Sequence, residues 1–169
     1  NRVLAYFGLK VLRRTPRSGL LSLFRLSRLE ARDISEEDVG FCIAPRINAA
    51  SRMDEPRRAF ELLSTKNPVW AMATAEHLEK KNNERKLAVS EMLEEVDRML
   101  SLQTLGSVLV VGHDSWRPGV VGLAASRIVE KYKRTAFVYG GEGSTDLKGS
   151  CRSDGSVNMV SLMQAAPRD

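Results

Sequence analysis

The spacing of hydrophobic and polar positions predicts helices in the first third of the chain. Apolar residues recur at helical spacing over about 2–14 and 18–29, and a TPRSG turn separates these two segments. A third helix is expected after Ser35, because Asp38 three residues later completes an approximate capping box. Asp54 is expected to cap the helix that follows.

One long helical pattern dominates the middle of the chain. Asn67 and Pro68 suit the N-cap and first helical position, and no Gly or Pro interrupts Val69 to Leu105. A helix of about 35 residues is about 50 Å long. Its apolar residues gather at the two ends, and residues 79–86 contain none. This pattern favours a linker helix between two lobes, with a solvated middle, over a coiled-coil strut.

The pattern after Gly106 predicts a strand, a helix and a second strand. The β-branched run at 107–111 is typical of a strand covered on both faces, and TAFVYG at 135–140 is the second strand. A helix over about 120–133 between them makes a βαβ unit with parallel strands. The loop at 112–119 then lies where α/β folds tend to bind anions. The expected fold class is α/β.

Composition narrows the class of protein. A chain of 169 residues with 43% hydrophobic and 28% charged residues fits one domain or two small lobes, not a disordered tail or a fibre. Cys42 and Cys151 have neither metal-site nor disulfide-framework spacing. No apolar run approaches the roughly 20 residues that span a bilayer. We expect a soluble, cytoplasmic protein without a membrane partner.

Positive charge is concentrated near the beginning of the sequence. The formal net charge is +5, yet residues 1–32 hold eight basic side chains against Glu30 alone. This segment could attract a polyanion through its phosphates. A solvated basic helix face, or packing against an acidic neighbour, explains the charge equally well.

The segment DLKGSCRSDG at 146–155 is the strongest candidate for a phosphate site. As a strand it would place Lys148, Ser150 and Arg152 on one face, with Gly149 and Cys151 on the other. One hydroxyl and two cations suit a phosphate group. An edge strand protected by charge is the alternative explanation.

The segment PRINAASRM supplies a second candidate. If it is helical, Asn48 and Arg52 share a face, whereas Arg46 points elsewhere. The small residues around them would allow a ligand to approach closely. Tight helix packing is the structural alternative, with the arginines bound to helix carbonyls.

The strand-end loop offers a third, weaker candidate. His113, Trp116 and Arg117 could provide stacking and charge to a nucleotide. The sequence shows neither the dense Asp, Glu and His cluster of a two-metal nuclease nor a nucleophilic triad. We therefore expect no catalytic residue and no metal ligand in this chain.

Three motifs together resemble the RecJ family of single-strand-specific exonucleases. They are PRINAASRM at 45–53, WRPGVVGLAASRIVEKY at 116–132 and KGSCRS at 148–153, and GLKVLRRTPRSGL at 8–20 also fits. The resemblance implies a DHH lobe with two Mn²⁺ or Mg²⁺ ions, a long connecting helix and a DHHA1 lobe. Because the chain begins without Met inside an apolar helical pattern, we expect it to be a fragment of a larger protein.

The resemblance also implies how the chain divides. Residues 1–66 would be the helical end of the DHH lobe, 67–105 the connecting helix, and 106–169 the first part of the DHHA1 lobe. The metal-binding motifs would lie outside the chain, so the fragment alone is expected to be inactive. The missing part of the DHH lobe and single-stranded DNA are its implied partners.

The same resemblance assigns roles to residues. Ser150 and Arg152 would bind a 5′-phosphate in a groove between the lobes, and Arg46 or Arg52 would approach that phosphate from the DHH lobe. The chain departs from the family pattern at three positions, since Ser51 and Cys151 replace Gly and Arg117 replaces His.

The expected function is therefore part of a metal-dependent 5′→3′ exonuclease for single-stranded DNA, acting in repair and recombination. Two alternatives remain at this point. One is another DHH phosphoesterase that acts on short oligonucleotides or cyclic dinucleotides. The other is a non-catalytic nucleic-acid-binding module.

Overall fold

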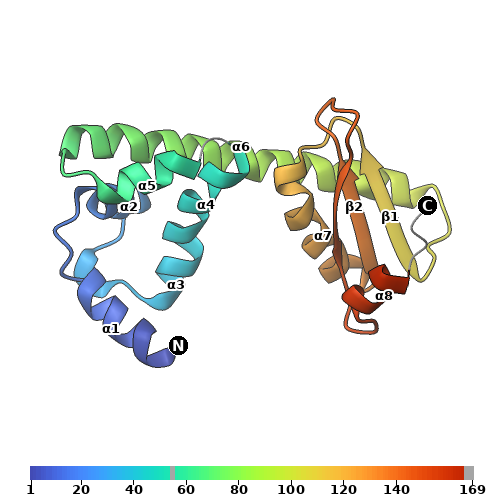
Figure 1. Cartoon of the computed structure of the whole chain (residues 1–169), viewed down its shortest axis with the longest axis horizontal. Coiled ribbons are helices and arrows are strands. Elements are labelled where there is room, and N and C mark those ends of the chain that lie inside the picture. Colours follow the sequence, from blue (N-terminus) through green and yellow to red (C-terminus); the bar gives the residue numbers. More distant parts are fainter. Residues whose placement is uncertain (54–55, 166–169) are drawn as a thin grey trace. The chain divides into compact units, whose positions relative to one another are not determined.

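The structure is a computed structural model that describes residues 1–53 and 56–165, and it divides into two compact units (Figure 1). Unit 1 comprises Asn1–Arg85 and unit 2 comprises Lys86–Asp169. The division falls within helix α6 (Pro68–Ser101), so this helix contributes one half to each unit. The expected cap Asp54 lies outside the described residues.

Unit 1 is built from helices, as the sequence predicts. Its elements before α6 are α1 (Arg2–Leu12), α2 (Ser18–Ser27), the 3₁₀ turn η1 (Ala31–Asp33), α3 (Glu36–Asp38), the π-helix η2 (Val39–Ile43), α4 (Ala44–Met53) and α5 (Pro56–Ser64). The capping box at Ser35 and Asp38 is confirmed: the Ser35 Oγ accepts from the Asp38 N–H at 3.2 Å, and the Asp38 carboxylate accepts from the Ser35 N–H at 2.9 Å. The Ser35 N–H and the Ser35 hydroxyl, which donates to the same carboxylate at 2.7 Å, together lower the pKa of Asp38.

The core of unit 1 forms where α2, α5 and the first half of α6 meet. Leu23, Leu62 and Leu78 are fully buried there, together with small residues of α6. Gly19 allows α2 to approach α5 closely, because a Cβ at this position would lie 1.9 Å from the Leu62 carbonyl oxygen. Backbone contact at this glycine therefore fixes how the two helices pack.

Helix α6 begins as predicted, and small residues form part of its buried face. The Asn67 side chain caps it by accepting from the N–H groups of Val69 and Trp70 at 3.0 and 3.1 Å. Val69 is 79% exposed, whereas Ala71 and Ala75 are fully buried. The prediction that the polar middle is solvated all round is wrong, because Asn82 is only 1% exposed.

Unit 2 contains a small mixed sheet with a covering helix, which confirms the α/β prediction. Strands β1 (Val108–His113) and β2 (Thr135–Gly140) are parallel and are joined by α7 (Pro118–Tyr132). The third strand, β3 (Lys148–Arg152), is antiparallel to β2, and the strand order is β1-β2-β3. A short helix, α8 (Met159–Ala165), follows β3.

Helix α7 covers one face of this sheet (Figure 1). Leu109 and Val111 of β1 are buried on that face, and Ala136 and Val138 of β2 pair with them in register. Val110 is 64% exposed on the opposite face. The expectation that β1 is covered on both faces is therefore not met among the described residues, and strand propensity alone accounts for its β-branched run.

The second half of α6 packs against α7. Asp97 accepts hydrogen bonds from the Lys131 ammonium at 2.5 Å and from the Tyr132 hydroxyl at 2.6 Å. The bond from Lys131, followed by the bond from Tyr132, lowers the pKa of Asp97. The bond to Asp97 raises the pKa of Tyr132 to about 12. These contacts hold the helix pair that carries the sheet.

Candidate phosphate-binding site

The candidate site lies on the face of β3 that turns toward α7. The antiparallel register sets Ser150 opposite Val138 and Arg152 opposite Ala136, so both site residues lie on the α7 side of the sheet. Cys151 pairs with Phe137 and belongs to the other face. The structure thus has the division of faces that period two predicts, and the Cys151 side chain stays off the face of Arg152.

Arg152 makes three hydrogen bonds at this site. Its Nη1 donates to the Ser150 Oγ at 3.1 Å and to the Cys151 carbonyl oxygen at 2.7 Å. Its Nε donates to the Ser126 Oγ of α7 at 3.3 Å. These three acceptors are all neutral. No carboxylate of another described residue forms an ion pair with the exposed guanidinium, so its charge is not compensated there.

Helix α7 leaves space next to the Ser150 and Arg152 side chains, because it has a glycine at position 122. A Cβ at Gly122 would lie 3.1 Å from the Ser150 Oγ and 3.5 Å from the Arg152 Nη2. Ser126, one turn further along the same helix, donates from its hydroxyl to the Gly122 carbonyl oxygen at 3.2 Å. Sequence reasoning missed Gly122 and Ser126, although their i, i+4 spacing was a signal that they share one helix face.

Lys148 is exposed and lies opposite Gly140 at the carboxyl end of β2. It is on the same face of β3 as Ser150 and Arg152 by alternation. No hydrogen bond within residues 1–53 and 56–165 links the Lys148 side chain to either of them. The structure therefore brings Ser150 and Arg152 into contact and leaves Lys148 as an exposed charge two residues away.

Arg46 of the second candidate is held inside unit 1. Its Nε lies 2.5 Å from the Glu79 Oε2, at ion-pair distance but without the alignment of a hydrogen bond, and its Nη1 donates to the Cys42 carbonyl oxygen. The Arg46 side chain is only 12% exposed. This ion pair joins α4 to α6 and uses the charge of Arg46 within the protein.

Asn48 and Arg52 are exposed on α4, which is helical as expected. Ser51 stands where the family pattern has Gly, and its hydroxyl donates to the Asn48 carbonyl oxygen of the same helix at 3.0 Å. Arg52 lies near Arg85 of α6: burial lowers the pKa of Arg85, and the positive charge of Arg52 lowers it further. Arg85, which sequence reasoning missed, therefore lies near Arg52 in unit 1, and its Nη2 donates to the Asn82 side-chain oxygen at 3.0 Å.

The strand-end loop residues do not form a stacking platform. Trp116 is 5% exposed, and its Nε1 donates to the Glu95 carboxylate at 2.7 Å, so the indole belongs to the core of unit 2. Because the Trp116 ring is buried, the prediction that it stacks on a nucleotide is wrong. Arg117 forms an ion pair with Glu142 at 2.7 Å, and the His113 ring bonds the Ser115 hydroxyl at 2.7 Å.

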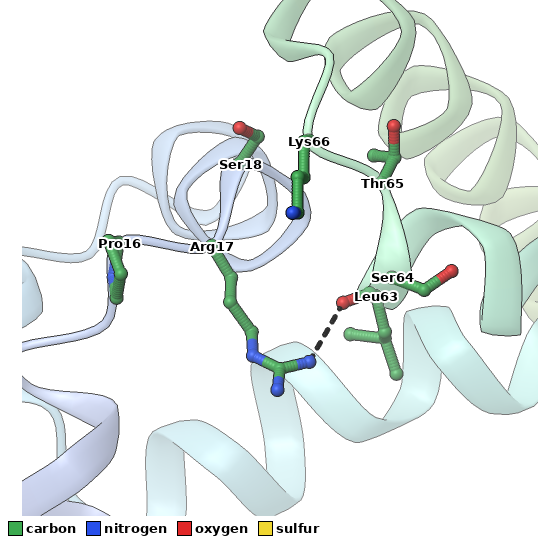
Figure 2. A pocket seen from close by; sticks show the side chains of 7 residues that line it. All are labelled: Pro16, Arg17, Ser18, Leu63, Ser64, Thr65 and Lys66. Carbon is green, nitrogen blue, oxygen red and sulfur yellow. Dashed lines mark hydrogen bonds between the residues drawn. The ribbon is translucent and has the colours of Figure 1, made fainter.

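The basic segment near the N-terminus lines a hollow of about 400 Å³ in unit 1 (Figure 2). Arg17 reaches from the start of α2 to the Leu63 carbonyl oxygen at 3.2 Å, as the dashed line shows. Arg13 similarly donates to the Ile34 carbonyl oxygen at 2.9 Å. Part of the basic charge therefore anchors the turns of unit 1, and Lys66 adds a further cation to the hollow.

Comparison with known proteins shows which proteins the chain resembles. The family model for the DHHA1 domain matches residues 105–168. RecJ of Bacillus subtilis, a single-stranded-DNA-specific exonuclease, is 38% identical over 161 residues, which are 94% of this chain and 20% of the relative. RecJ of Escherichia coli is 32% identical over 172 residues, covering 97% of this chain and 30% of the relative.

Solved structures show the same likeness. The crystal structure of RecJ from Thermus thermophilus in complex with Mg²⁺ has a TM-score of 0.82 and 31% identity, covering 98% of this chain and 25% of that one. Residues 105–168 therefore resemble a DHHA1 domain. The chain as a whole is RecJ-like over nearly its whole length, and it spans between a fifth and a third of the length of the curated relatives named above.

The described residues do not fit a divalent metal site. RecJ structures from T. thermophilus were solved with Mg²⁺ and with Mn²⁺. Within residues 1–53 and 56–165 of this chain, no three His, Cys, Asp or Glu side chains converge to hold an ion. The same residues include no helix that is long and apolar enough to cross a membrane.

Proposed function

We propose that this chain is the substrate-binding part of a metal-dependent 5′→3′ exonuclease for single-stranded DNA that acts in DNA repair and recombination. The observation that carries the proposal is the uncompensated Arg152 guanidinium beside the Ser150 hydroxyl, in a chain that is RecJ-like along nearly its whole length. The B. subtilis and E. coli relatives are named as single-stranded-DNA-specific exonucleases, which supports this choice of substrate.

The chemistry of the site suits a terminal phosphate. The Arg152 Nη2 makes no hydrogen bond to another described residue, and it lies on the same side as the Ser150 hydroxyl. Ser150 accepts from Arg152 through its oxygen, so its own proton is available for a phosphate oxygen. A guanidinium and a hydroxyl together therefore offer charge-assisted donors to one dianionic group.

The DHH and DHHA1 assignments follow the same proposal. Residues 1–66 would be the end of the DHH lobe, 67–105 the connecting helix and 106–169 the first part of the DHHA1 lobe. Asn48 and Arg52 would contribute to substrate binding from the DHH side. The metal ions would be held by other parts of the full-length protein and would supply the hydrolytic chemistry. This chain's own residues bind and orient the DNA end.

Capture of a terminal phosphate would also explain the 5′→3′ direction. A site that binds only the 5′-terminal phosphate places the adjacent phosphodiester bond at a fixed distance from it, so that hydrolysis proceeds from that end. Phosphate capture would account for the direction, and a groove too narrow for duplex DNA would account for the strand selectivity.

Degradation of end-labelled DNA by the full-length protein tests the proposal. Single strands with a 5′-phosphate should be degraded from the 5′ end, whereas blunt duplexes of the same sequence should persist. Arg152→Ala should lower kcat/KM on the phosphorylated strand by about tenfold or more, since a hydrogen bond to a charged group contributes roughly 1.5–3 kcal/mol.

Arg127→Ala is the matched control, because it removes an exposed arginine of the same unit that pairs with Glu130 instead. Its kcat/KM should stay close to that of the unchanged protein. Degradation from the 3′ end, or equal loss in both variants, would contradict the proposed function.

A further inference from the structure

Ser126 links the candidate phosphate site to helix α7 through a directed chain of hydrogen bonds. The Arg152 Nε donates to the Ser126 Oγ at 3.3 Å, and the Ser126 hydroxyl donates to the Gly122 carbonyl oxygen at 3.2 Å. The proton of Ser126 is used on the helix backbone, so its lone pair faces the guanidinium. Ser126 and Gly122 lie within the motif at 116–132, but neither is among the residues that the motifs assign to the phosphate pocket.

This chain of bonds fixes which nitrogen atoms of Arg152 remain for a ligand. Nε is bonded to Ser126, and Nη1 is bonded to Ser150 and to the Cys151 carbonyl oxygen. The remaining Nη2 is the atom that lies 3.5 Å from the position a Cβ at Gly122 would occupy. Because a guanidinium is planar, holding Nε and Nη1 also sets the direction of Nη2.

We infer that Ser126 is a positioning residue for the 5′-phosphate end of the DNA, and that it acts by orienting Arg152 over Gly122. The inference rests on the proposed function, because it concerns the same phosphate. Arginine is long and flexible, and the Arg152 side chain is exposed, so without Ser126 only its Nη1 would be held and the guanidinium plane could turn about that nitrogen. Ser126 lowers the entropy that phosphate binding must remove, which is the usual effect of preorganisation.

A serine that only bonds its own helix backbone would behave differently. Such bonds to the carbonyl three or four residues earlier are common in helices and need no further role. Ser101 of α6 has this kind of bond, donating to the Arg98 carbonyl oxygen at 2.8 Å. Among the described residues it makes no hydrogen bond with Ser150 or Arg152, so Ser101→Ala is a matched control for Ser126→Ala.

The test compares DNA strands with a 5′-phosphate and with a 5′-hydroxyl as substrates of the full-length protein. Ser126→Ala should lower the ratio of their kcat/KM values about three- to tenfold, mainly through a higher KM for the phosphorylated strand. Ser126→Thr keeps a hydroxyl at the same place and should restore most of the ratio. Ser101→Ala should leave the ratio unchanged, and thermal unfolding should show that every variant is folded.

The possible outcomes separate this inference from the proposed function. If Arg152→Ala lowers the ratio and Ser126→Ala does not, Ser126 has no positioning role and the pocket remains. If neither variant changes the ratio, the phosphate pocket itself is wrong. A Ser126→Thr protein that behaves like Ser126→Ala would also overturn the inference, because the hydroxyl would then not be the group that matters.

Discussion

At the scale of single residues, the geometry of the candidate site depends on Gly122, which has no side chain. Gly122 leaves space beneath Ser150 and Arg152, and an added Cβ would be 3.1 Å from the Ser150 Oγ, tighter than ordinary van der Waals contact. Gly122→Ala should therefore displace Ser150 and reduce the preference for 5′-phosphorylated DNA several-fold. Measured kcat/KM ratios for the two end groups would check this.

A matched substitution exists for this prediction. Gly8→Ala also replaces a helical glycine, but nothing lies within 4 Å of its added Cβ. Both changes should favour the helix by up to about 1 kcal/mol, so stability alone would not separate them. Equal phosphate preference in the two variants would mean that the space above Gly122 has no functional role.

Asp97 gives a residue-scale prediction about pH. Its pKa is lowered in the folded protein by hydrogen bonds from Lys131 and Tyr132, so its contribution to stability is present above the unfolded pKa of about 4 and is lost as pH falls further. Because Asp97 is more than a third exposed, this contribution is below about 1 kcal/mol. Asp97→Asn should flatten the acid limb of the urea-unfolding stability curve, and an unchanged limb would exclude this contribution.

Residue-scale predictions from the sequence succeeded where backbone geometry decides. The alternation of β3 places Ser150 and Arg152 on one face whatever the rest of the fold does. The burial of Trp116 was not predictable, because its partner Glu95 lies 21 residues away on α6. The ion pair of Arg46 with Glu79 depends in the same way on how α4 packs against α6.

At the scale of elements, α6 shows what periodicity can and cannot reveal. Its beginning was predictable, because Asn67 and Pro68 have specific chemistry at a helix N-terminus. Its buried face was harder to find, since Ala71 and Ala75 carry small side chains that a search for large apolar residues passes over. The burial of Asn82 in the polar middle depends on tertiary packing that sequence spacing does not encode.

The contact between α4 and α6 leads to a stability prediction. Arg46→Ala would leave the partly buried Glu79 carboxylate without its partner, which should lower the free energy of unfolding by about 2–3 kcal/mol. The double variant Arg46→Met with Glu79→Leu should be less destabilised than Arg46→Ala, because no unpaired charge remains. Urea unfolding of the three proteins measures this. A double variant as unstable as the single one would argue against the ion pair.

At the scale of the whole molecule, the sequence predicted the fold class and the order of elements, including the βαβ unit and the mixed sheet. These follow from local patterns and from general rules of chain connection. The detailed phosphate site could be predicted only on its β3 side. Its α7 side depends on the register between helix and sheet, which brings Gly122 and Ser126 beneath the strand.

Whole-molecule charge gives a prediction about salt. Arg2, Arg14 and Arg25 are exposed in the basic segment, and replacing all three by Gln should weaken binding to single-stranded DNA equally for both end groups. Each lost phosphate contact should reduce the slope of log K against log salt by about 0.7. Anisotropy titrations at several salt concentrations measure this slope. A selective loss for the 5′-phosphorylated strand would place the phosphate pocket in the basic segment instead.

The most direct test of the central claim compares binding of 5′-phosphorylated and 5′-hydroxyl single strands to the full-length protein and to its Arg152→Ala variant. Fluorescence anisotropy at low and moderate salt gives the four dissociation constants. We predict that the unchanged protein prefers the phosphorylated strand several-fold, that added salt does not abolish this preference, and that Arg152→Ala removes it. Equal affinity of the unchanged protein for both strands, with the same salt dependence, would contradict a phosphate pocket at Ser150 and Arg152.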